Sequence, residues 1–222
     1  MSITTDRKTS NAQPPAKSLP VVDLFTDGSC RGKKQRIGGW AFILRHRSTG
    51  VEKVQSGGLH KSSGEQAEIH AVINGLSALR LRSHVLLHCD NIGVVNGVSQ
   101  FLPEWKRFGW RLSPKAKQLI NNVDLWQMLD ALLAKHDVTV KWVKGHAGHP
   151  DNERCDKLSG KAADELLKNG GILPASIQKR TISGTPAAPA PAVKSVAAQT
   201  ISTPVKPDEK LHEVDLFTDG AC

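Results

Sequence analysis

Three short segments rich in apolar residues stand out from polar surroundings near the start of the chain. These are VVDLF at 21–25, GGWAFIL at 38–44 and a third run over 51–59, separated by turn residues. Short runs of this kind are typical of strands, and the short connections favour hairpins. The pattern therefore predicts three consecutive antiparallel strands.

Beyond residue 62 the hydrophobic period changes and helices alternate with strands. The segment SSGEQ at 62–66 resembles a capping box and precedes apolar residues at helical spacing, which predicts a helix over about 65–81. The apolar run HVLLHC at 84–89 predicts a buried strand, with a short helix after it. Further elements are expected as a helix around 125–133, a strand at 138–143 and a helix around 155–166. This order predicts an α/β fold with a mixed five-stranded sheet, three antiparallel strands and then parallel ones, flanked by helices.

The two ends of the chain differ in composition from the middle. Residues 1–19 are polar and aperiodic and are expected to form a disordered leader, and 20–168 form the folded domain. Residues 169–210 hold six of the twelve prolines and are interpreted as a Pro/Ala-rich linker. Residues 211–222 match 19–30 in nine of twelve positions, so they are interpreted as a truncated repeat of the first strand.

Composition narrows the class of protein. Apolar residues make up 39% of the chain, and all five tryptophans lie between Trp40 and Trp142, so a core is expected there. The net charge of +9 favours an anionic partner such as nucleic acid. No apolar run approaches the ~20 residues that cross a bilayer, and no secretory signal is readable, so a cytoplasmic protein without membrane association is expected. The four cysteines lack CxxC or zinc-ligand spacing and are interpreted as reduced thiols.

Four acidic residues fall where predicted elements begin or end on one side of the sheet: Asp27, Glu68, Asp90 and Asp156. Taken singly, each of these aspartates is more often a turn former or a helix cap than part of a site. Together they could serve two hard cations, because Mg²⁺ binds oxygen ligands and uses only one or two carboxylates plus substrate phosphate. Two such ions suit the in-line hydrolysis of a phosphodiester.

The sequence around these acids resembles the type 1 ribonuclease H family of the bacterial cellular kind, over about residues 20–168. The resemblance lies in FTDGSC with Asp27, QAEIH with Glu68, LLHCDN with Asp90, and most specifically in WVKGHAGHPDNERCDKL with His146 and Asp156. NVDLWQMLDALL at 122–133 and WKRFGWR at 105–111 are also similar to family segments.

The resemblance implies a ribonuclease H-like fold and a metal-dependent endonuclease. Such an enzyme cuts the RNA strand of RNA/DNA hybrids and leaves 5′-phosphate and 3′-hydroxyl ends. By the same resemblance Asp27 bridges two Mg²⁺ ions, with Mn²⁺ as a possible substitute, Asp156 holds the nucleophile-side ion, and Glu68 and Asp90 hold the other. His146 stands in a glycine-containing loop and is expected to move a proton, although a lone loop histidine is usually only a surface residue. His149 is interpreted as loop structure.

A basic segment, residues 104–117, is the main candidate for nucleic-acid binding. It interleaves cations with aromatic residues, a combination suited to phosphates and bases; the other interpretation is a solvated face whose aromatics belong to the core. The predicted contact residues are Lys33 and Lys34 in the first turn, and Trp105, Lys106, Arg107, Trp110 and Arg111 in the basic segment. The family resemblance implies that this segment grips the DNA strand, and the protein is expected to act as a monomer.

Two segments depart from the family pattern. Gly64 and Glu65 stand where the family usually has Asn and then Asn or Gln, and RGKKQRIGG at 31–39 replaces the family's Asn-Pro-Gly turn. Recognition of the RNA 2′-hydroxyl separates RNA from DNA in such enzymes. Two alternatives therefore stay open: a hybrid-binding module with weak or no cleavage, and a related nuclease or integrase of the same fold that acts on DNA. The complete carboxylate set argues against the first, since unused clustered acids repel one another.

Overall fold

The computed structural model describes residues 18–32 and 34–170. Most of the predicted leader, the linker beyond residue 170 and the repeat at 211–222 lie outside these residues, as does Lys33. Those predictions, including the domain boundaries built on them, remain predictions.

Five strands form one mixed sheet in the order β3-β2-β1-β4-β5. Strands β1 (Val21–Arg31), β2 (Ile37–His46) and β3 (Glu52–Leu59) pair antiparallel. β4 (His84–Cys89) adds to β1 in parallel, and β5 (Asp137–Trp142) adds to β4 in parallel. The predicted mixed five-stranded sheet is confirmed, and the carboxyl ends of β1 and β4 meet at one edge of it.

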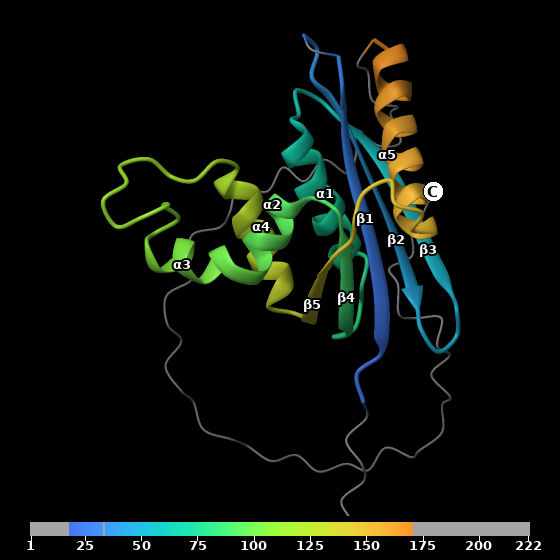
Figure 1. Ribbon diagram of the computed structural model, residues 1–222, viewed down its shortest axis with the longest axis horizontal. Coiled ribbons are helices and arrows are strands. Elements are labelled where there is room, and N and C mark those ends of the chain that lie inside the picture. The colour runs from blue at the N-terminus through green and yellow to red at the C-terminus, as the bar shows by residue number, and fades with distance from the viewer. Residues whose placement is uncertain (1–17, 33, 171–222) are drawn as a thin grey trace, which may run out of the picture.

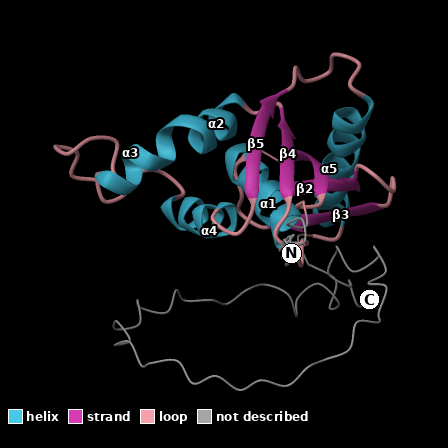
Figure 2. Ribbon diagram, turned by 90° about the horizontal axis from the view of Figure 1, so that it is seen from below, coloured by secondary structure: helices cyan, strands magenta, loops and turns pink. Residues whose placement is uncertain are grey.

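Helices cover both faces of this sheet (Figure 1). α1 (Gly64–Ser77) packs on one face against β1 and β2, and α4 (Val123–Leu133) packs on α1. α5 (Pro150–Lys168) crosses the other face over the three antiparallel strands. α2 (Ile92–Asn96), the π-helical turn η1 (Gly97–Phe101) and α3 (Leu102–Arg107) follow β4, and α3 with its following loop projects away from the sheet (Figures 1 and 2).

The hydrophobic core is divided by the sheet into two unequal layers. The larger layer lies between the sheet and α1 and includes Phe42, Leu76 and Trp126, all nearly inaccessible to solvent. The smaller layer lies under α5, where Cys155 packs with Phe25 and Ile43. Because both faces of the sheet are covered, β4 carries the continuous apolar run Val85–Leu87 rather than strict alternation.

The first helix ends earlier than the sequence predicts. The capping box is present, since Gln66 N–H binds the Ser63 hydroxyl and the Gln66 side chain accepts from Ser63 N–H. However, α1 stops at Ser77 instead of residue 81, and the chain turns at Ala78. Leu79 is buried outside the helix. Apolar residues thus continue at helical spacing after α1 ends, because the chain that follows still packs in the core. This explains why the predicted C-terminal boundary of the helix was wrong.

Two glycines let both helices approach the sheet closely. A Cβ atom at Gly28 of β1 would lie 2.2 Å from the backbone N of Glu68 in α1. A Cβ atom at Gly39 of β2 would lie 2.0 Å from the backbone O of Ser159 in α5. Both distances are far below atomic contact, so only glycine permits these two packings.

Within residues 18–32 and 34–170, no helix is both long enough and apolar enough to span a bilayer.

Candidate active site

Asp27 occupies the centre of the predicted acidic group. It lies on β1, opposite Ala41 of β2, and is 6% exposed. Ser159 of α5 donates a short hydrogen bond from its hydroxyl to Asp27 Oδ2. Burial, the largest cause, raises the pKa of Asp27 to about 6 against the effect of this hydrogen bond, and the neighbouring charges of Asp90 and Asp156 act in the same direction as burial. Asp27, Asp90 and Asp156 therefore lie close enough for their charges to interact.

Glu68 reaches the same place from α1. Its side chain is buried, and its Oε2 atom has no hydrogen-bond partner among the described residues. Burial raises the pKa of Glu68 well above its ordinary value, and the charges of Asp27 and Asp90 raise it further. A carboxylate oxygen left unpaired in a buried position is costly unless a cation or water meets it.

Asp90 follows β4 directly and is held by three elements. Asn152 of α5 donates from Nδ2 to Asp90 Oδ2 at 3.0 Å. Trp142 of β5 donates from Nε1 to the backbone O of Asp90 at 3.1 Å. Gly145 lies against its carboxylate, since a Cβ there would be 2.8 Å from Oδ2. The backbone and the side chain of Asp90 are therefore both fixed.

Asp156 and His146 complete the group at its more open side. Asp156 lies on α5, and His146 Nδ1 is 3.8 Å from Asp156 Oδ2. The His146 side chain is 82% exposed and its backbone has a φ of 51°, a left-handed conformation in a loop between β5 and α5. The structure thus brings all five predicted site residues to one edge of the sheet, with the histidine at the solvent side.

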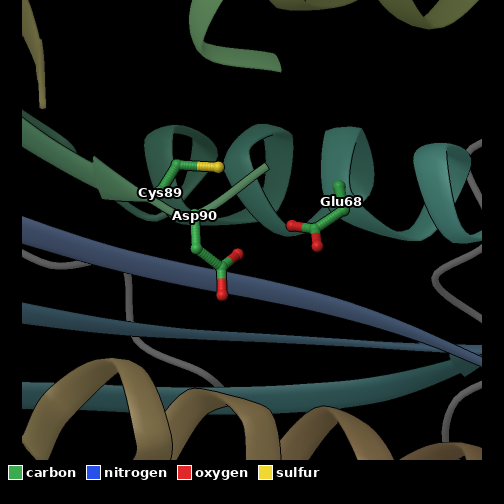
Figure 3. A group of neighbouring side chains, drawn as sticks. All are labelled: Glu68, Cys89 and Asp90. Atoms are coloured by element: carbon green, nitrogen blue, oxygen red, sulfur yellow. The ribbon is translucent and has the colours of Figure 1, made fainter. Parts of the chain in front are cut away.

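The donor set fits hard divalent cations. It consists of carboxylates, their mutual repulsion raises the pKa of the two buried ones, and Glu68 keeps one oxygen unpaired. Glu68, Cys89 and Asp90 each offer a ligand atom, and these atoms lie within 4.8 Å of one another (Figure 3). Bound cations would relieve the repulsion that the protein alone leaves uncompensated.

Two residues of the group were missed by the sequence analysis. Asn152 and Ser159 hold Asp90 and Asp27, and both are buried on α5. Their spacing in the sequence could have identified them. Asn152 is four residues before Asp156 and Ser159 is three residues after it, so all three lie on one face of the helix. His149, taken as loop structure, is the N-cap of α5, where its side chain accepts from Asn152 N–H.

The basic segment is partly paired and partly exposed. Lys106 forms an ion pair with Asp130 at 2.8 Å between Nζ and Oδ2. Arg107 packs over the Phe108 ring and is mostly exposed. Trp105 packs edge-on against Trp126, with ring centroids 5.1 Å apart, and Trp110 also contacts the larger core layer. Both tryptophans thus pack partly against the core. This agrees with the alternative interpretation of the basic segment, in which its aromatic residues belong to the core.

The rest of the predicted contact surface remains accessible. Arg111 is half-buried, and its guanidinium donates to the backbone O of Gly109 at 3.0 Å. Lys34 is exposed in the turn between β1 and β2. A hollow of about 560 Å³ lies between the basic segment and α1, with Trp105, Lys117 and Glu65 in its wall. Cationic and aromatic groups therefore face a recess next to the helix that carries Glu68.

Comparison with known proteins places these features in a family. Residues 20–164 match the family model for RNase H. The Ribonuclease H of Bartonella bacilliformis is 43% identical over 150 residues, which cover 68% of this chain and 94% of that protein. The Ribonuclease H of Escherichia coli O139:H28 is 45% identical over 145 residues, covering 65% of this chain and 90% of that protein.

Solved structures agree in fold. LC9-RNase H1, a type 1 RNase H, superposes with a TM-score of 0.58 at 24% identity, covering 72% of this chain and 80% of that one. The RNase H domain of prototype foamy virus superposes with a TM-score of 0.54 at 22% identity, covering 65% and 94%. These likenesses concern the arrangement of sheet and helices.

Proposed function

Since the chain belongs to the ribonuclease H family, whose bacterial type 1 members are endonucleases acting on RNA/DNA hybrids, we propose that its clustered carboxylates are the catalytic centre of such an enzyme. The centre comprises Asp27, Glu68, Asp90 and Asp156 with His146. The observation that carries the proposal is the unpaired, buried Glu68 Oε2 beside Asp27 and Asp90, whose charges raise the pKa of Glu68. The reaction is hydrolysis of the RNA strand, leaving 5′-phosphate and 3′-hydroxyl ends.

The four carboxylates would hold two Mg²⁺ ions, and Mn²⁺ could replace them. Bound there, such ions supply activation of the attacking water and neutralise charge on the leaving oxygen. The charges of both Asp90 and Asp156 act on Asp27, so Asp27 is the residue suited to bridge two cations. Ser159 and Asn152 orient the carboxylates of Asp27 and Asp90 before substrate arrives, which lowers the cost of ordering them.

His146 is the group suited to move a proton. It reaches Asp156 but is largely exposed, so it can meet both the reaction centre and bulk water. His146 and Gly148 lie in the same loop, and both have a left-handed backbone conformation. This loop therefore does not continue the regular structure of β5 or α5. In this role the imidazole exchanges protons during hydrolysis or product release.

The surface for the hybrid extends from this centre to the basic segment. Arg107 and Arg111, with Lys34 on the β1–β2 turn, supply cations for phosphates, and the recess beside Trp105 offers an aromatic wall. At the position where the family usually has an amide, Glu65 accepts a hydrogen bond from Asn122 Nδ2 at 3.0 Å. Asn122 thus places a side-chain amide on this surface. This supports recognition of the RNA strand although Gly64 and Glu65 replace the amides that the family usually has.

The compartment and assembly follow from the same proposal. Cys30, Cys89 and Cys155 are free thiols, as expected in the reducing cytoplasm. The proposed centre is assembled from β1, α1, the end of β4 and α5 of one chain, so a monomer carries every residue assigned to it.

The test is cleavage of labelled substrates of one sequence. RNA/DNA hybrid, RNA duplex and DNA duplex are incubated with the full chain, with and without Mg²⁺, and product ends are identified by their reactivity with a 5′-phosphate-dependent exonuclease. We expect Mg²⁺-dependent cleavage of the hybrid alone. Hybrid binding without cleavage in Mg²⁺ or Mn²⁺ would instead favour the binding module, and cleavage of the DNA duplex would favour a DNA-acting relative.

A further inference from the structure

The thiol of Cys89 lies beside the proposed metal-binding carboxylates. Cys89 is the last residue of β4, fully buried, and directly precedes Asp90. One ligand atom from each of Glu68, Cys89 and Asp90 lies within 4.8 Å of the other two. Figure 3 shows Glu68 reaching from α1 toward the end of β4, where the Cys89 and Asp90 side chains leave the chain on different sides. This group therefore combines two hard oxygen donors with one soft sulfur donor.

A second observation points to a ligand at this group. Glu68 is 94% buried, given its exposed fraction of 6%, and its Oε2 atom is without a hydrogen-bond partner within the described part of the chain. Cys89 Sγ makes a long contact, 3.9 Å to the backbone O of Asn91, and also interacts with the Thr26 side chain. Both side chains thus keep unused ligand capacity in a space closed to bulk solvent.

We propose that Glu68, Cys89 and Asp90 form a binding site for a thiophilic divalent cation of the zinc class. Zinc binds thiolate at about 2.3 Å and carboxylate at about 2.0 to 2.2 Å, so tetrahedral coordination needs sulfur and oxygen roughly 3.6 Å apart. The ligand atoms lie within 4.8 Å of one another, so the site requires side-chain adjustment when the cation binds. On binding, the S–H bond of Cys89 breaks, its proton passes to solvent, and a metal–sulfur bond forms without electron transfer.

This site differs in preference from the Mg²⁺ chemistry, and it rests on the proposed function only in sharing Glu68 and Asp90. Mg²⁺ selects oxygen ligands and gains nothing from sulfur, whereas thiolate selects zinc-like ions. A thiophilic cation held by Cys89 lies on the α1 side of the sheet and occupies two carboxylates that the proposed reaction uses. Zinc-class ions are therefore inhibitors of Mg²⁺-dependent cleavage that compete for Glu68 and Asp90.

Cys155 provides a matched control. It is as buried as Cys89, and its Sγ donates to the backbone O of Phe25 at 3.5 Å. Among the described residues, the group that contains Cys89 is the one in which three potential ligand atoms all lie within 4.8 Å of one another, and Cys155 is not part of it. Cys155 thus shares residue type and burial with Cys89 but not its place in this group.

The experiment uses Cd²⁺ as the probe and needs no nucleic acid. In the full chain with Cys30→Ser and Cys222→Ser, Cd²⁺ is titrated while the ultraviolet thiolate-to-cadmium charge-transfer band is recorded. We expect one Cd²⁺ per chain, displaced by Zn²⁺. The band is lost in Cys89→Ser and Cys89→Ala and kept in Cys155→Ser. Glu68→Gln removes a charged ligand and weakens the apparent affinity by at least the roughly 10-fold that loss of an outer-shell partner costs.

Several results overturn the proposal. These are absence of the band in the parent, its persistence in both Cys89 variants, its loss in folded Cys155→Ser, or an unchanged affinity in Glu68→Gln. Should the Cys89 variants fail to fold by circular dichroism, cadmium NMR of the parent decides, because an all-oxygen chemical shift excludes sulfur ligation. Cleavage of hybrid in Mg²⁺ alone tests the proposed function separately, so failure of one is distinguishable from failure of the other.

Discussion

Asn152 donates a hydrogen bond to Asp90, with 3.0 Å between Nδ2 and Oδ2, and so joins α5 to the end of β4. Asn152 is buried, and it precedes Asp156 by one helical turn. One helix therefore carries a carboxylate of the proposed centre and orients another that comes from a different element. The relative placement of Asp90 and Asp156 depends on how α5 packs, not only on the residues themselves.

Asp90→Asn is expected to abolish cleavage while the fold and hybrid binding remain. The change removes a metal-binding charge and keeps the size of the side chain, which can still accept from Asn152. The measurement is Mg²⁺-dependent cleavage together with a binding titration. Asp137→Asn, an exposed acid at the opposite end of the parallel strands, is the matched control and should cleave normally. Near-normal cleavage by Asp90→Asn contradicts the assignment.

His146→Ala is expected to lower turnover by about 10²-fold and leave measurable activity, because it removes a proton-transfer group and no metal ligand. Its exposure makes a structural cost small, so the melting temperature should stay unchanged. The check is the single-turnover rate at saturating Mg²⁺ compared with Mg²⁺ affinity. Lost metal binding would show that the histidine had been assigned the wrong role.

Asp27→Asn is expected to stabilise the metal-free protein at pH 7.5 by about 1 to 3 kcal/mol. Folding raises the pKa of Asp27 from 3.8 to about 6, so the folded state favours the protonated form. As pH rises between these values the unfolded chain loses its proton first, and stability falls; above pH 6 the full penalty of about two pKa units remains. The asparagine variant never ionises and avoids that penalty.

Urea unfolding in the presence of a chelator, at pH 4 and at pH 7.5, tests whether Asp27→Asn stabilises the protein. The difference in unfolding free energy between Asp27→Asn and the parent should be small at pH 4 and grow toward pH 7.5. Added Mg²⁺ should stabilise the parent more than the variant. A variant less stable than the parent at pH 7.5 would mean that the Ser159 hydrogen bond outweighs burial and repulsion.

Replacing Lys106, Arg107 and Arg111 together by Gln is expected to flatten the dependence of log affinity on log salt by up to about 2 to 3 units. Each lost phosphate contact removes about one released counterion. Lys106 contributes least, because it is already paired with Asp130. The rate at saturating hybrid should change little. Arg82→Gln with Lys135→Gln, both exposed beyond the far end of the parallel strands, is the control, and an equal effect there would locate binding elsewhere.

Deleting residues 211–222 is expected to leave hybrid cleavage unchanged, and Asp219→Asn should have no effect. The repeat contains a counterpart of Asp27 but none of Glu68, Asp90 or Asp156. Activity of Asp27→Asn is compared with the segment present and absent. Rescue that depends on the segment would show that Asp219 replaces Asp27, contrary to this expectation.

Much of the fold is predictable because local patterns and tertiary structure agree in this chain. The strand at 84–89 is a short apolar run with clear ends, and the Ser63–Gln66 capping box marks the start of α1. The end of the first strand was predicted wrongly, because β1 continues past residue 25 to Arg31 through polar residues paired with β2 and so contains Asp27. The acids of the candidate site were therefore found mainly from the resemblance of their surroundings, and Asp90 is the one that directly follows a strand. The structure brings them together at the shared edge of β1 and β4.

What the pattern could not supply depends on three-dimensional packing. The early end of α1 is invisible because Leu79 remains in the core after the helix stops. The core role of Trp105 depends on Trp126, a residue 21 positions away that only the fold places edge-on to it. Likewise Cys89 has no metal-ligand spacing in sequence, and its proximity to Glu68 arises from the packing of α1 against the sheet.

Gly28 and Gly39 constrain which substitutions the site tolerates. A side chain at either position would collide with the backbone of α1 or α5, not with a movable side chain, so no small substitution is available there. Neither glycine is itself a proposed ligand, yet Gly28 fixes how closely α1 approaches the sheet and Gly39 does the same for α5. The separation of the two helices that carry Glu68 and Asp156 is therefore set by two positions that have no side chain.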